Sequence, residues 1–152
     1  MGKPKVLVAL RDADSAEGLV SLACKLYQGM EADITALHVV EVPAVTPFEA
    51  DDESLDRPGK KILANGERAA KKFGTKLSTR LLHARQAGEA IVGEAKEQGV
   101  ELLVVGHHKA RARSLGEFLL GSTAQYVAHH APCRVLIQIP PSQRRETASI
   151  QA

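Results

Sequence analysis

Hydrophobic residues in this chain gather in five short runs, and the segments between them alternate apolar and polar positions with a helical period. The runs at residues 5–10 and 101–106 are almost continuously apolar and rich in valine and leucine. Such runs are typical of strands buried on both faces, as in a parallel sheet. Three further strands are predicted at residues 33–42, 76–85 and 133–139. Of the five, residues 76–85 are the least apolar, which predicts a position near an edge of the sheet.

Four helices are predicted between these strands, at residues 14–30, 60–73, 88–99 and 122–131. The first is predicted to begin at a cap formed by Asp14 and Ser15. Residues 43–60 are acidic, contain three prolines and show no period, so we expect a loop there.

Strands and helices therefore alternate strictly along the chain. This alternation, with buried strands, predicts an α/β fold in which helices cover both faces of a parallel sheet. In such sheets ligands bind beyond the carboxyl ends of the strands, where the strand order reverses. We expect the segments that follow Leu10, Val39 and Gly106 to surround one crevice.

The composition narrows the possible functions. The 152 residues are enough for one domain. This domain is predicted at residues 1–139, and a polar, disordered tail is predicted at residues 140–152.

A net charge of +2 and 3% aromatic residues argue against nucleic-acid binding. The two cysteines, Cys24 and Cys133, lie in apolar runs and favour buried thiols in a reducing compartment. No apolar run is long enough to insert in a membrane, so a soluble, cytoplasmic protein is expected.

One segment combines glycines, cations and hydroxyl groups. Gly106 ends a predicted strand, and Gly121 precedes a predicted helix that begins with Ser122 and Thr123. The loop between them carries three cations, Lys109, Arg111 and Arg113. Free amide groups at a helix N-terminus together with cations can bind a phosphate. An ordinary helix cap beside a solvated basic loop explains the same residues, and the pattern alone leaves both interpretations open.

Other reactive side chains give weaker evidence of a functional site. Two histidine pairs, His107–His108 and His129–His130, are candidates for a metal site. The second pair falls at the C-terminus of a predicted helix, where a cation suits the helix dipole. We therefore predict no metal site. Asp12, Asp14 and Glu17 could hold Mg²⁺ beside a nucleotide, although helix capping accounts for them more simply. The sequence contains no recognisable catalytic set. A binding module is expected, and any hydrolytic activity would be slow.

Over residues 5–139 the chain resembles the universal stress protein family. The resemblance lies in KVLVAL, LHVVEV, AGEAIVGEAKEQGVELLVVGHH and, most specifically, LLGSTAQYVAHHAPCRVLIQIP. It implies a Rossmann-like fold of the adenine nucleotide alpha hydrolase type, with a five-stranded parallel sheet. It also implies a homodimer formed through the last strand, residues 134–139. Many members of the family bind ATP, and others do not.

The chain departs from the pattern of the ATP-binding members, G-x2-G-x9-G-(S/T). Gly106 matches its first glycine, and Gly121 with Ser122 matches its end. Lys109 occupies the place of the middle glycine, and 11 residues rather than 9 separate it from Gly121. Arg11, followed by Asp12, stands where these members usually have an aspartate near the ribose.

The resemblance implies binding of ATP or AMP, with or without Mg²⁺, around the loop between Gly106 and Ser122. In the family, the residue that matches Val39 faces the adenine through its backbone. The predicted binding residues are Leu10, Arg11, Asp12, Val39, Val105, Gly106, His107, Lys109, Arg111, Arg113, Gly121, Ser122 and Thr123. The protein would then act as a regulatory module through dimer or partner contacts. The alternative is a domain that binds no nucleotide and regulates a membrane transporter.

Overall fold

The computed structural model describes residues 2–45, 53–107 and 120–139. Its strands are β1 (Lys5–Ala9), β2 (Asp33–Glu41), β3 (Leu77–Ala84), β4 (Leu102–Gly106) and β5 (Arg134–Gln138). Its helices are α1 (Ala13–Leu26), α2 (Glu53–Lys72), α3 (Ala87–Gln98) and α4 (Ser122–His130). Strands and helices alternate along the chain, as the sequence predicts.

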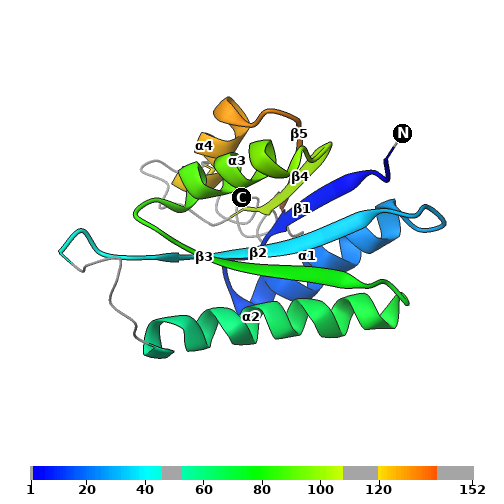
Figure 1. Cartoon of the computed structure of the whole chain (residues 1–152), viewed down its shortest axis with the longest axis horizontal. Coiled ribbons are helices and arrows are strands. Elements are labelled where there is room, and N and C mark those ends of the chain that lie inside the picture. Colours follow the sequence, from blue (N-terminus) through cyan, green and yellow to red (C-terminus); the bar gives the residue numbers. More distant parts are fainter. Residues whose placement is uncertain (1, 46–52, 108–119, 140–152) are drawn as a thin grey trace, which may run out of the picture.

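The five strands form one parallel sheet in the order β3-β2-β1-β4-β5 (Figure 1). The prediction that β3 lies at an edge is confirmed. β1 pairs with β2 on one side and with β4 on the other, so Val8 lies opposite both Ala36 and Val104. The chain therefore reverses its direction of winding between β1 and β4, which is where ligands bind in sheets of this kind.

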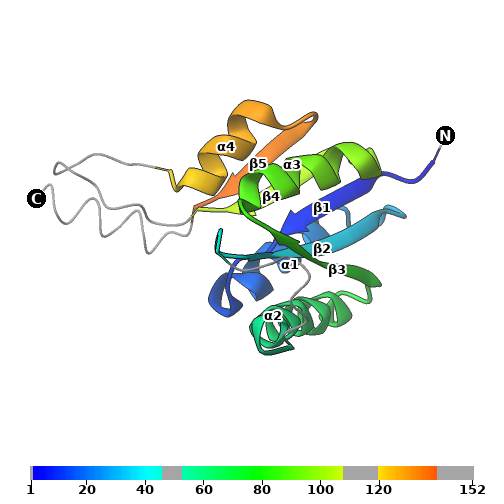
Figure 2. The ribbon, with the colours of Figure 1, turned by 60° about the vertical axis from the view of Figure 1, so that its left-hand side comes forward.

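Helices cover both faces of the sheet (Figure 2). Val8 on β1 and its neighbours pack against α1 and α2, including Val20 and Ile62. Leu7, which points to the opposite face of the sheet, belongs to a second core with α3 and α4, including Val127. Alternate residues of a strand point to opposite faces, and both faces are buried here, which explains why this strand is continuously apolar in sequence.

Both boundaries of α1 differ from the predicted ones. The N-cap of α1 is Asp12 rather than Asp14, and the helix ends at Leu26, so the predicted extension through residue 30 is wrong. Gly29 then adopts a left-handed backbone with φ of +83°, which a helix cannot accommodate.

The predicted loop at residues 43–60 is wrong in its second half, because α2 begins at Glu53 and contains Pro58. Proline removes one backbone hydrogen bond, but this part of α2 also packs against the sheet and buries Gly59. Tertiary packing therefore outweighs the local preference against a helix.

The backbone of α2 lies unusually close to the sheet at Gly59. A Cβ atom at this position would lie 2.6 Å from Cδ2 of His38 and 2.8 Å from Cδ1 of Leu81. Both distances are far below van der Waals contact, so only glycine fits without a displacement of the sheet side chains. Gly93 on α3 is the opposite case, because a Cβ atom there would meet no atom within 4 Å.

We expect Gly59→Ala to lower the free energy of unfolding by about 1–3 kcal/mol through overpacking, even though alanine is the better helix former. The matched variant Gly93→Ala should raise it by about 0.5–1 kcal/mol. Urea denaturation of the two variants beside the parent chain measures both effects. Equal stabilisation by the two substitutions would contradict the close approach of α2.

Candidate functional site

The carboxyl ends of β1, β2 and β4 surround a pocket of about 290 Å³. The first turns of α1, α3 and α4 complete its wall. Its lining is mixed, with apolar side chains such as Leu37 and Ile91 beside carboxylate, hydroxyl and backbone groups. The pocket therefore lies at the reversal point of the strand order, where the sequence predicts a crevice.

Leu10 fixes the path of the chain from β1 into the pocket. Its N–H group donates to the carbonyl oxygen of Leu37 over 2.8 Å, which continues the ladder one residue beyond β1. Its own carbonyl oxygen lies 2.7 Å from Nδ1 of His38. A carbonyl can only accept, so Nδ1 carries the proton in this bond. The two bonds hold the segment that leads to Asp12 against β2.

Asp12 caps α1 at the edge of the pocket. Its carboxylate accepts a hydrogen bond from the backbone N–H of Ser15 over 2.8 Å and another from the Ser15 hydroxyl over 2.9 Å. Arg11, the preceding residue, is exposed and also lines the pocket. Asp12 therefore satisfies the start of its own helix and brings a negative charge to the pocket.

Glu41 plays the same part for α3. This residue ends β2, and its carboxylate accepts a hydrogen bond from the backbone N–H of Ala87, the first residue of α3, over 3.0 Å. Gln86, the N-cap of α3, makes no capping bond with its own side chain. A carboxylate from a neighbouring strand thus caps the helix, and it too lines the pocket.

The start of α4 differs from the other two. Its N-cap is Gly121, which has no side chain that could accept a bond from the first-turn amides. Ser122 is exposed and Thr123 half-buried at this end of the pocket. A helix N-terminus carries about half a positive charge on its free amide groups. Carboxylates bond the starts of α1 and α3, whereas the N-cap of α4 offers no side-chain acceptor.

The structure brings together all the predicted binding residues that it describes. Those that line the pocket are Leu10, Arg11, Asp12, Val39, Val105, Gly106, His107, Gly121, Ser122 and Thr123. The three predicted cations of the loop, Lys109, Arg111 and Arg113, lie outside the described residues. Gly106 ends β4 as predicted, and a Cβ atom there would lie 3.3 Å from Cδ1 of Leu19, a side chain that also lines the pocket.

Sequence reasoning missed several residues of the wall. They are Ala9, Ser15, Leu19, Leu37, His38, Glu41, Ala87, Ile91 and Ala124. Glu41 and Ala87 could have been found from the order of the elements. Glu41 ends β2, which lies next to β1, and Ala87 begins α3, the helix that follows β3. The remaining ones lie within predicted elements, where the local pattern shows only that they are helical or extended.

The histidine, cysteine and carboxylate side chains considered as candidates in the sequence have structural roles or environments that do not favour catalysis. Nδ1 of His130 lies 2.9 Å from the carbonyl oxygen of Tyr126, and the two rings stack with centroids 4.1 Å apart, so His130 closes the C-terminus of α4. Burial raises the pKa of the thiols of Cys24 and Cys133, which opposes thiolate formation. Within residues 2–45, 53–107 and 120–139, no three His, Cys, Asp or Glu side chains are grouped to hold a metal ion.

A sequence model of the universal stress protein family matches residues 4–138. The chain belongs to the universal stress protein family. Universal stress protein YxiE of Bacillus subtilis is 32% identical over 146 residues, which cover 88% of this chain and 97% of that protein. Across the described residues, no helix has the length and apolar character needed to cross a bilayer.

Solved structures of the family share the fold. Universal stress protein UspA from Lactobacillus plantarum matches with a TM-score of 0.71 and 24% identity, over 91% of this chain and 100% of that one. A universal stress protein in complex with cAMP matches with a TM-score of 0.68 and 24% identity, over 91% of this chain and 98% of that one. A universal stress protein from Archaeoglobus fulgidus in complex with dAMP matches with a TM-score of 0.67 and 20% identity, over 90% of this chain and 97% of that one. The family and the five-stranded Rossmann-like sheet implied by the sequence are thus confirmed.

Proposed function

We propose that the pocket binds an adenine nucleotide with its phosphate at the N-terminus of α4. The observation that carries this proposal is the difference between the three helix starts. Asp12 and Glu41 cap α1 and α3 with carboxylates, whereas glycine stands at the N-cap of α4. An anion would therefore gain the amides of α4 and find the other two starts already bonded.

The same charges give the ligand one orientation. Glu41 lies on β2, and β1 separates this strand from β4 and the β4–α4 side of the pocket. A phosphate beside Glu41 would be repelled, while one at Ser122 would be attracted. The sugar and base of the nucleotide then extend toward β2. Apolar side chains on that side, Leu37, Val39 and Ile91, suit the faces of a base.

Adenine suits Glu41, the carboxylate that lines the pocket on the β2 side. One oxygen of Glu41 already accepts from Ala87, and a carboxylate has acceptor capacity for further donors. The exocyclic amine of adenine is such a donor. The complexes of related proteins with cAMP and dAMP support the same class of ligand. A volume of about 290 Å³ lies at the lower end for ligand sites and favours AMP over ATP.

The proposed regulatory role needs a surface that could respond to the ligand. β5 forms the edge of the sheet opposite β3, and its apolar residues Val135, Leu136 and Ile137 are only half-buried. An unpaired edge strand with partly exposed apolar side chains suits a second copy of the chain. β5 also pairs with β4, which ends at the pocket, so dimer and ligand would share one strand pair.

We expect Ser122→Asp to weaken AMP binding by about 100-fold. The new carboxylate and the phosphate of AMP would lie about 6 Å apart, and two such charges repel by roughly 3 kcal/mol at an effective dielectric constant near 20. Asp at the first helical position favours the helix dipole, so the fold is retained. Ser122→Asn, similar in shape but neutral, should remain within about threefold of the parent chain. Isothermal titration calorimetry with AMP measures the three affinities.

Adenosine is the internal control for this titration. It lacks the phosphate, so Ser122→Asp and Ser122→Asn should bind it equally. An equal loss of AMP and adenosine binding in Ser122→Asp would place the phosphate elsewhere, and the absence of binding by the parent chain would reject the proposed ligand class.

Glu41→Gln should reduce the preference for AMP over IMP by at least about tenfold. IMP carries a carbonyl oxygen where AMP carries the amine, and the carboxylate of Glu41 would leave that oxygen without a donor. In the variant, the amide oxygen can still cap Ala87 while its NH₂ group faces the base. Competition binding of AMP and IMP to both chains gives the two ratios, and an unchanged ratio would show that Glu41 does not contact the base.

A further inference from the structure

The exposed face of α2 carries a row of cations in two groups, at residues 57–61 and 68–72. At about 100° per residue, its six basic residues fall within an arc of roughly 120°, and all are exposed. This basic stripe consists of Arg57, Lys60, Lys61, Arg68, Lys71 and Lys72. The opposite arc holds the buried residues, among them Ile62, Leu63 and Gly66. From first to last cation the stripe is about 22 Å long, at about 1.5 Å per residue.

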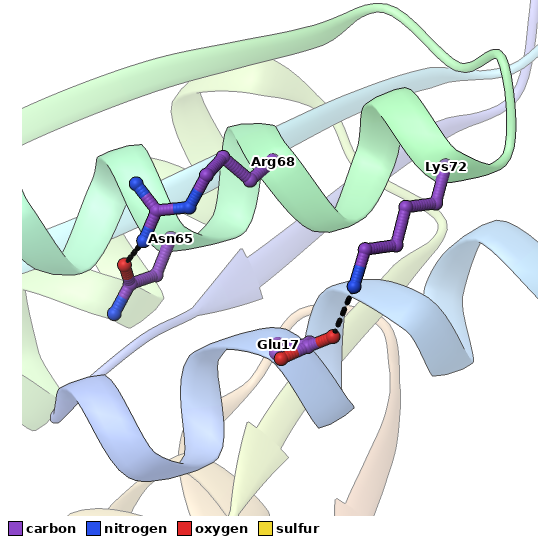
Figure 3. Close-up of polar contacts among 4 residues, drawn as sticks. All are labelled: Glu17, Asn65, Arg68 and Lys72. Carbon is purple, nitrogen blue, oxygen red and sulfur yellow. Dashed lines mark hydrogen bonds and ion pairs between the residues drawn. The ribbon is translucent and has the colours of Figure 1, made fainter.

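Nearby carboxylates offset part of this charge. Lys72 forms an ion pair of 2.8 Å with Glu17 of α1, which lowers the pKa of that carboxyl group. Arg68 donates to the side-chain amide of Asn65, a neutral group (Figure 3). Within the described part of the chain, the remaining four cations of the stripe make no ion pair. Two exposed carboxylates lie beside the cations: Glu53 falls within the same arc at the start of α2, and Glu67 lies at its margin. Among the described residues, five of the six cations thus form no ion pair, although the charge of Glu17 also acts on Arg68.

α2 is also an outermost element of the molecule. It packs on α1, β2 and β3, and nothing among the described elements covers its other side (Figures 1 and 2). The chain as a whole has a net charge of only +2, so this concentration of positive charge is local to one straight helix. A row of this kind presents its charges side by side to a flat partner.

We propose that the basic stripe docks the protein on the surface of an anionic lipid bilayer. A bilayer offers a plane of negative headgroups, and each lysine or arginine near it contributes about a fivefold gain in affinity. Lysine predominates in the stripe, which suits a diffuse field of charge better than paired recognition of one group. The stripe exposes no large apolar side chain, so the contact is electrostatic and reversible, without insertion.

A nucleic acid is the competing polyanion, and the stripe lacks the features that reading it requires. It contains no aromatic residue for base stacking. The only side-chain amide of α2, that of Asn65, lies beside the stripe and is bonded to Arg68. A single row of cations on one helix also contacts one nucleic-acid backbone at most, whereas duplex-binding proteins place an element in a groove. The geometry therefore favours a planar partner.

Sedimentation with vesicles tests this surface. The full chain should bind vesicles of phosphatidylcholine with phosphatidylserine at low salt, release as salt rises, and ignore vesicles of phosphatidylcholine alone. Lys60→Gln with Lys61→Gln should weaken the partition by about 25-fold, since two cations are lost. Lys3→Gln with Lys96→Gln removes the same charge from exposed positions outside α2 and should leave the partition within about threefold of the parent chain.

Three results would overturn the proposal: no binding to the anionic vesicles, equal weakening by the two double variants, or binding to a mixed-sequence DNA duplex without binding to vesicles. Ser122→Asp, which alters the pocket, should bind the vesicles as well as the parent chain does. The docking surface and the nucleotide site therefore succeed or fail separately.

Discussion

The need to satisfy the free amides of three helix N-termini at one edge of the sheet is the constraint on which the candidate site depends. Parallel strands send their following helices away from the same edge, so the amide-rich starts of α1, α3 and α4 gather there. Each start needs an acceptor for its free N–H groups. The chain supplies carboxylates to two of them through Asp12 and Glu41. It places glycine at the N-cap of the third, which therefore adds no carboxylate to the pocket.

This arrangement depends on packing behind the pocket. His38 holds the carbonyl group of Leu10 and so fixes the segment between β1 and α1. The ring of His38 occupies space that a side chain on α2 would otherwise fill, and Gly59 provides that space. The closest approach of α2 to the sheet and the position of Asp12 are therefore linked through one histidine ring. The outer side of the same helix carries the basic stripe.

Much of the fold could be predicted because buried parallel strands are continuously apolar and the helices between them are amphipathic. The start of α2 could not, since Pro58 and the acidic residues before it favour a loop locally, and only packing against the sheet makes that turn helical. The choice of Asp12 over Asp14 as a cap was equally hidden, because both have the same local chemistry. The contacts of Glu41 with Ala87 and of His38 with Leu10 join residues 46 and 28 positions apart. Single-sequence periodicity holds no information at such separations.

The central claim is that an anion binds the open start of α4. The most direct measurement is an NMR titration of the isotope-labelled chain with AMP and, separately, with adenosine. The account predicts that AMP shifts the backbone amide signals of Ser122 and Thr123 strongly, that adenosine shifts them little, and that both ligands shift Val39. Phosphate-dependent shifts at Ser15 or Ala87, with Ser122 and Thr123 unmoved, would contradict it.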